Sequence, residues 1–130
     1  MIILADHNLE GQAVLLWGTL ARQGWVELLE LQLLTFVEVR LPIDADDRTV
    51  WRFVQENQML LLTGNRSMKD ADSLEETIRQ ENRANAIPVI TVADVDRLDE
   101  RSYREKCASR LIEIILDLGI YYGSGRLFIP

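Results

Sequence analysis

Short runs of consecutive apolar residues alternate along the chain with segments whose apolar residues recur every three or four positions. Runs of the first kind are too short for helices and predict strands buried in a sheet. They cover residues 1–5, 26–34, 59–63 and 88–92, and residues 126–129 predict a further strand at an edge. The helical spacing predicts amphipathic helices within residues 9–20, 47–54, 73–78 and 103–118.

This alternation of strands and helices predicts an α/β fold. The expected form is a three-layer α/β/α domain with a mainly parallel central sheet and helices on both faces. Residues 1–5 are apolar throughout, so their strand should be central. Right-handed crossovers should bring the carboxyl ends of the strands to one edge of the sheet. The length of 130 residues suits one domain that spans residues 1–130.

Local signals predict where helices begin. Asp46 and Asp47 suit the start of a helix, where side-chain oxygens accept hydrogen bonds from unpaired backbone N–H groups. Two pairs, Thr35–Glu38 and Ser73–Glu76, have the spacing of the capping box.

Composition narrows the classes of function. The net charge of −7 argues against binding nucleic acid by phosphate neutralisation alone, but it leaves room for a nucleic-acid enzyme with a carboxylate site. One cysteine, Cys107, and one histidine, His7, exclude an intrachain disulfide and a four-ligand Cys/His zinc site. No signal-peptide pattern opens the chain, and charged residues interrupt its longest apolar stretch, residues 25–41. A cytoplasmic protein that does not enter the membrane is therefore expected.

Oxygen-bearing side chains follow the predicted strands. Asp6 follows the first strand and Asn65 the third, while Asp47 opens a helix. Such oxygens suit Mg²⁺ or Mn²⁺, which can activate water for phosphodiester hydrolysis. Asp6 is the strongest candidate, because a carboxylate directly after a buried strand is costly unless it is paired or ligating. The candidate catalytic residues are Asp6, Asp47 and Asn65, and the candidate metal ligands are Asp6, Asp47, Asp70 and Asp72. The alternative roles are helix caps for Asp47 and solvated loop charges for Asp70 and Asp72.

Three segments resemble the PIN-domain-like nucleases, most closely a short bacterial branch related to the toxins of toxin–antitoxin pairs. They read ADHNL from position 5, DRTVW from position 47 and LLLT from position 60. That branch has an Asp-Glu-Asn-Leu motif after its first strand, then an aspartate that starts a helix, then an apolar strand that ends in Thr-x-Asp-x-Asp. Asp6 matches the first motif, with His7 in place of its glutamate, and Asp47 matches the helix-start aspartate. The resemblance covers roughly residues 1–95.

The resemblance implies a metal-dependent endoribonuclease that uses Mg²⁺ or Mn²⁺, with RNA as substrate and an antitoxin as protein partner. The third motif departs from the family pattern, because Asn65 and Ser67 stand where two aspartates are expected. Asp70 and Asp72 could replace them from a longer loop. Since Mg²⁺ sites depend on ligand charge, the site should be weakened, and weak or no cleavage is expected.

Three functions therefore stay open. The first is a metal-dependent ribonuclease with a weakened acidic site, and the second is a non-catalytic PIN-like protein-interaction module that could act as a homodimer. The third is a receiver-like phosphoacceptor domain, which also uses acidic groups at strand ends. It lacks paired acids after the first strand, and Lys69 and Lys106 are poorly placed for the lysine such a domain needs.

Overall fold

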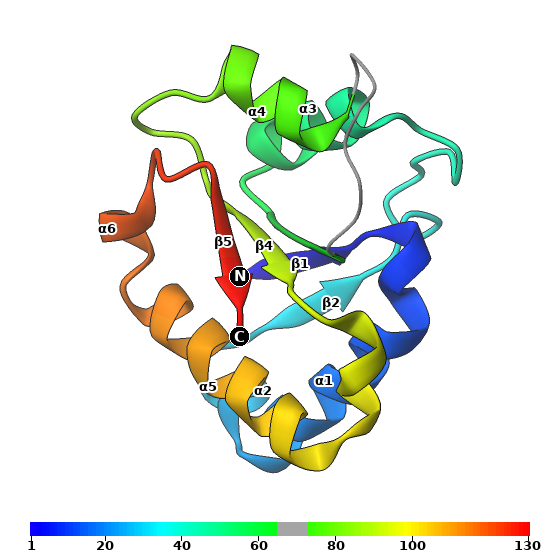
Figure 1. Ribbon diagram of the computed structural model, residues 1–130, viewed down its shortest axis with the longest axis vertical. Coiled ribbons are helices and arrows are strands. Elements are labelled where there is room, and N and C mark those ends of the chain that lie inside the picture. Colours follow the sequence, from blue (N-terminus) through cyan, green and yellow to red (C-terminus); the bar gives the residue numbers. More distant parts are fainter. Residues whose placement is uncertain (65–72) are drawn as a thin grey trace.

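Five parallel strands form one sheet through the middle of the molecule (Figure 1). The computed structural model describes residues 1–64 and 73–130. The spatial order of the strands is β2-β1-β3-β4-β5, and each neighbouring pair is parallel. The strands are β1 (Ile2–Ala5), β2 (Gln32–Leu34), β3 (Leu60–Gly64), β4 (Val89–Val92) and β5 (Arg126–Ile129). The α-helices are α1 (Glu10–Arg22), α2 (Trp25–Leu28), α3 (Asp47–Glu56), α4 (Leu74–Glu81), α5 (Arg101–Leu116) and α6 (Leu118–Tyr121), and the 3₁₀-helices are η1 (His7–Leu9) and η2 (Val95–Asp99). The predicted α/β fold with a parallel sheet is confirmed.

Strand β1 has neighbours on both sides, as its apolar sequence predicts. Leu4 pairs in register with Leu34 of β2 and with Leu61 of β3. The side chains of Ile3, Leu4 and Ala5 are no more than 1% exposed. A strand with apolar residues on both faces must be covered by helices on both faces, which accounts for this position.

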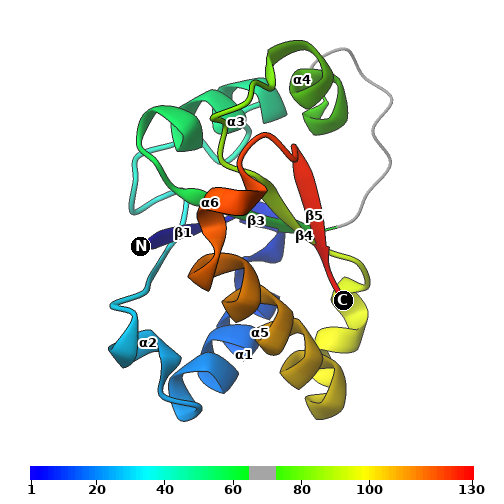
Figure 2. The ribbon, with the colours of Figure 1, turned by 90° about the vertical axis from the view of Figure 1, so that its left-hand side faces the viewer.

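Helices cover both faces of the sheet (Figure 2). Helices α1, α2 and α5 lie on one face, here called the α1/α5 face, and α3 and α4 lie on the other, the α3/α4 face. Successive strand residues alternate between these faces, as the pleat requires. The core on the α1/α5 face includes Ile3, Leu62, Ile90, Leu16 and Leu111. The core on the α3/α4 face includes Leu4, Leu61, Val89, Val54 and Leu74.

The crossover from β4 to β5 has the opposite hand to the other three. The steps from β3 to β4 and from β4 to β5 go in the same direction across the sheet, but α4 lies on the α3/α4 face and α5 on the α1/α5 face. Because crossovers between parallel strands are right-handed almost without exception, the step through α5 is the left-handed one. The prediction that all crossovers are right-handed is therefore wrong for this step. All strand carboxyl ends nevertheless lie at one edge, since the strands are parallel.

Residues 26–34 do not form one strand, contrary to the prediction. Gly24 adopts a left-handed conformation with φ 86°, after which Trp25–Leu28 form the short helix α2. Glu30 also has a positive φ, 51°, which a continuous strand cannot contain. Trp25 packs its side chain on the core of the α1/α5 face. Only Gln32–Leu34 pair with β1, and the apolar residues Trp25, Val26 and Leu28 lie in α2 instead.

The predicted capping box at Thr35–Glu38 forms with both of its bonds, and at Ser73–Glu76 the bond to the cap side chain forms. The Glu38 carboxylate accepts a hydrogen bond from the Thr35 N–H at 3.0 Å, and Thr35 Oγ1 accepts one from the Glu38 N–H at 3.4 Å. Ser73 Oγ accepts from the Glu76 N–H at 3.2 Å at the start of α4. These local bonds fix the direction in which the chain enters each turn.

Asp46 is the N-cap of α3, and Asp47 is the first residue of that helix. The Asp46 carboxylate accepts a hydrogen bond from the Thr49 N–H at 2.8 Å, and this bond holds the pKa of Asp46 below its usual value of 3.8. Asp46→Ala should lower the free energy of unfolding by about 1 kcal/mol, measured by urea denaturation at pH 7. A carboxyl with a depressed pKa stabilises the fold above its unfolded pKa and loses that contribution as the pH falls through the folded value. The difference between wild type and Asp46→Ala should therefore shrink below about pH 4.

Asp46→Asn is the control, because an amide oxygen can still cap the helix but does not titrate. It should unfold at nearly the wild-type urea concentration at pH 7. A difference between wild type and Asp46→Ala that stays constant down to pH 2 would show that the carboxylate charge has no part in the cap.

Candidate functional site

A row of polar side chains crosses the sheet near the carboxyl ends of three neighbouring strands. Thr63 of β3 pairs in register with Thr91 of β4. Asp6 comes directly after β1 and lies beside Thr63, to which it is hydrogen-bonded. All three project to the α3/α4 face, because the residues before them pack in the core on the other face: Ala5, Leu62 and Ile90. Asp6 is 9% exposed, and both threonines are 0% exposed.

The Asp6 carboxylate is held in place by its neighbour on the next strand. Thr63 Oγ1 donates a hydrogen bond of 2.7 Å to Asp6 Oδ2. A hydroxyl bound to a carboxylate at this distance forms a strong, charge-assisted bond, which offsets part of the cost of burying the charge. The backbone of Asp6 is fixed as well, since its N–H donates to the Leu62 carbonyl at 2.9 Å. Asp6 therefore presents a carboxylate of defined orientation at the carboxyl edge of the sheet.

Asp47 joins the starts of two helices on the α3/α4 face. It is the first residue of α3, and its Oδ2 accepts a hydrogen bond from the Leu74 N–H, at the start of α4, at 3.0 Å. A negative charge is favourable at a helix N-terminus, because the unpaired N–H groups carry partial positive charge. Asp47 therefore links the start of α3 to the start of α4, in addition to the predicted role of a cap for its own helix.

His7 and Glu10 form a small polar group next to Asp6. His7 Nδ1 lies 3.4 Å from Glu10 Oε2, and the same oxygen accepts a hydrogen bond from the Phe36 N–H at 3.4 Å. The His7 ring also lies beside the Phe36 ring, with centroids 6.1 Å apart. These contacts attach the loop after β2 to the start of α1.

The other three predicted site residues, Asn65, Asp70 and Asp72, lie outside the described residues. Within residues 1–64 and 73–130, no group of three or more Asp, Glu, His or Cys side chains could hold a metal ion. Magnesium-type sites in proteins need only one or two carboxylates, with water and substrate phosphate completing the coordination. Asp6 and Asp47 are the two carboxylates of the candidate site that lie within the described residues.

Cys107 is a core residue, as its place on an apolar helix face predicts. Its side chain is 0% exposed, and burial raises the pKa of the thiol to about 11. The thiolate is the nucleophilic form of cysteine, so Cys107 is not suited to covalent catalysis.

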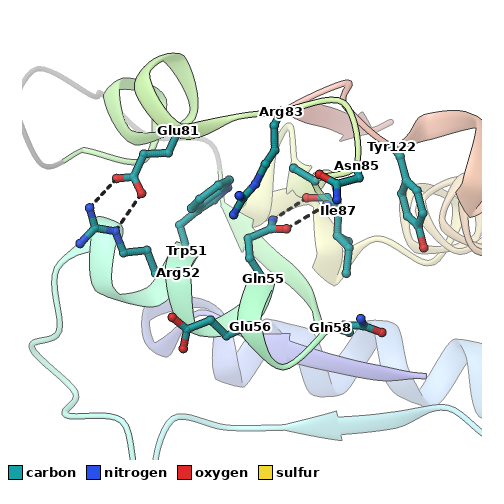
Figure 3. Close-up of a pocket in the computed structure, with 11 residues that line it drawn as sticks. Trp51, Arg52, Gln55, Glu56, Gln58, Glu81, Arg83, Asn85, Ile87 and Tyr122 are labelled. Atoms are coloured by element: carbon teal, nitrogen blue, oxygen red, sulfur yellow. Dashed lines mark hydrogen bonds and ion pairs between the residues drawn. The ribbon is translucent and has the colours of Figure 1, made fainter.

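A polar pocket of about 510 Å³ lies away from this row, near the start of β3 and β4 (Figure 3). The Gln55 amide forms two hydrogen bonds with the backbone of Ile87, donating at 2.8 Å and accepting at 2.9 Å. Arg52 pairs with Glu81 at 2.8 Å, and these bonds hold the pKa of Glu81 below its usual value. Arg48 donates to Glu81 as well. Most of these groups thus connect α3 to α4 and to the segment before β4, which is a structural role.

Comparison of the chain with protein-family models, with curated proteins and with solved structures finds no match. Among the helices in residues 1–64 and 73–130, none is long and apolar enough to span a membrane.

Proposed function

We propose that this chain is a PIN-like protein of nuclease type, which holds Mg²⁺ or Mn²⁺ weakly at Asp6 and acts on single-stranded RNA. The Asp6 carboxylate is the observation that carries the proposal. It follows a central strand, is 9% exposed, and is oriented by the Thr63 hydroxyl. Asp6 lies at the carboxyl edge of a parallel sheet, and this edge is where α/β proteins bind their ligands.

Asp6, Thr63 and Asp47 have different roles in this proposal. Asp6 binds the cation, and Thr63 is a positioning residue that fixes the Asp6 carboxylate. Asp47 supplies a second carboxylate on the same face while it links α3 to α4. The bound cation would lower the pKa of its water and neutralise charge on the substrate phosphate. Two carboxylates give less negative charge than the family pattern, so cation binding should be weak.

A non-catalytic interaction module is the second candidate function. Exposed apolar side chains favour it, since Leu116 is 56% exposed and Ile120 is 76% exposed. The partner would be a protein such as an antitoxin, or a second copy of the chain in a homodimer. This candidate predicts a complex or a dimer, measurable by light scattering, and no metal-dependent cleavage.

The hypothesis of a receiver-like phosphoacceptor domain has less support. The strand order 2-1-3-4-5 also occurs in receiver domains, but there is no lysine in β5 (Arg126–Ile129). Lys106 lies on α5, on the other face of the sheet from Asp6. Lys69 is outside the described residues.

We expect the purified protein to cleave single-stranded RNA weakly or not at all in Mn²⁺. The reason is the low charge of the site. Any cleavage should be lost in EDTA and in Asp6→Asn, and it should be kept in Asp99→Asn, whose side chain is exposed on η2. Strong metal-dependent cleavage that survives Asp6→Asn would refute the proposal.

A further inference from the structure

Thr91 has a buried hydroxyl for which the described part of the chain supplies no hydrogen-bond partner. Its side chain is 0% exposed, and Oγ1 forms no hydrogen bond within residues 1–64 and 73–130. Such a group destabilises the folded state, because it loses its hydrogen bonds to water and gains none. Valine has the same shape and would avoid this loss. The hydroxyl therefore calls for a function other than stability.

Its place in the sheet indicates what it could bind. Thr91 is the next member of the row after Asp6 and Thr63, and all three project to the α3/α4 face. Neighbouring strands lie about 4.8 Å apart, so Asp6 and Thr91 are separated by roughly 10 Å at the backbone. A ligand that holds a cation at Asp6 and extends along the sheet would reach Thr91.

An exposed aromatic side chain ends the row. Phe128 of β5 pairs in register with Thr91 and is 47% exposed. It projects to the same face, because its neighbours Leu127 and Ile129 pack on the other one. Exposed aromatic rings serve as stacking surfaces for the bases of single-stranded nucleic acids.

We propose that the row Asp6–Thr63–Thr91–Phe128 binds one nucleotide of a single-stranded RNA. Thr91 Oγ1 donates a hydrogen bond to an oxygen of the phosphate, and the Phe128 ring stacks on the base. A neutral hydroxyl donor suits a phosphate oxygen, and a cation held at Asp6 would offset the negative charge of the phosphate. Because Thr91 is 0% exposed, its hydroxyl becomes accessible to the phosphate only when neighbouring side chains move on binding. This inference rests on the proposed function.

The test uses binding of fluorescein-labelled hexauridylate in Mg²⁺, followed by anisotropy. Thr91→Val and Phe128→Ala should each weaken binding about fivefold or more. The control for Phe128 is Ile120→Ala, which also truncates an exposed apolar side chain, and it should bind like wild type.

The control for Thr91 is Thr77→Val, which removes another fully buried hydroxyl that donates to the Ser73 carbonyl at 2.8 Å. Without ligand, Thr91→Val should melt about 3–6 °C above wild type and Thr77→Val below it. Wild-type affinity in Thr91→Val or in Phe128→Ala, or no binding by the wild type, would overturn the inference. Cation binding by Asp6→Asn at wild-type affinity would instead overturn the proposed function, so the two failures can be told apart.

Discussion

Replacing Asp6 with asparagine is expected to abolish the thermal stabilisation of the protein by Mn²⁺. Binding at ten times the dissociation constant should stabilise the wild type by about 1.4 kcal/mol, which raises the melting temperature by a few degrees. Asparagine keeps an acceptor for the Thr63 hydroxyl but removes the charge that attracts the cation. The affinity for Mn²⁺ should therefore fall about tenfold or more.

The same substitution should leave the metal-free fold intact. Removing a charge that is only 9% exposed avoids the cost of burying it, so the melting temperature in EDTA should not fall by more than a few degrees. Asp99→Asn is the matched control and should respond to Mn²⁺ like wild type. An equal Mn²⁺ shift in Asp6→Asn and wild type would place the cation elsewhere.

Phe36→Ala is expected to cause a large loss of stability. The Phe36 side chain is 2% exposed and packs in the core of the α3/α4 face, which also contains Leu4 and Trp51. Truncating a buried phenylalanine removes apolar contacts and leaves a cavity, at a cost of about 3–5 kcal/mol. Urea denaturation should show this loss directly.

The neighbouring residue gives the control for this prediction. Val37 is 72% exposed, so Val37→Ala should change the free energy of unfolding by no more than about 0.5 kcal/mol. Equal stabilities of the two variants would mean that the turn after β2 does not pack on the sheet as described.

The fold could be predicted where apolar runs are buried on both faces. Strand β1 illustrates this, because only a central strand of a parallel sheet needs a sequence without polar positions. Strand β2 could not be delimited, since the apolar residues of α2 and β2 form one run, and the left-handed backbone at Glu30 that separates them leaves no mark in the sequence pattern. The left-handed crossover through α5 could not be predicted from the sequence either. It depends on which face of the sheet that amphipathic helix covers, and amphipathicity does not reveal this.

The geometry of the candidate site could be predicted only in part. Asp6 was identified because a carboxylate at the end of a buried strand needs a partner, and Thr63 is such a partner. Thr91 was not singled out, because a threonine in an apolar strand is common and its place beside Thr63 emerges only from the register with β3. The bond from Leu74 to Asp47 was missed for a similar reason, as it joins residues 27 positions apart.

Anomalous diffraction from crystals grown with Mn²⁺ would test the central claim most directly, because it locates the cation without an activity assay. We predict a manganese peak within about 2.5 Å of an Asp6 carboxylate oxygen. Manganese found only at other carboxylates, with Asp6 still bound to Thr63 and no ion beside it, would contradict the account.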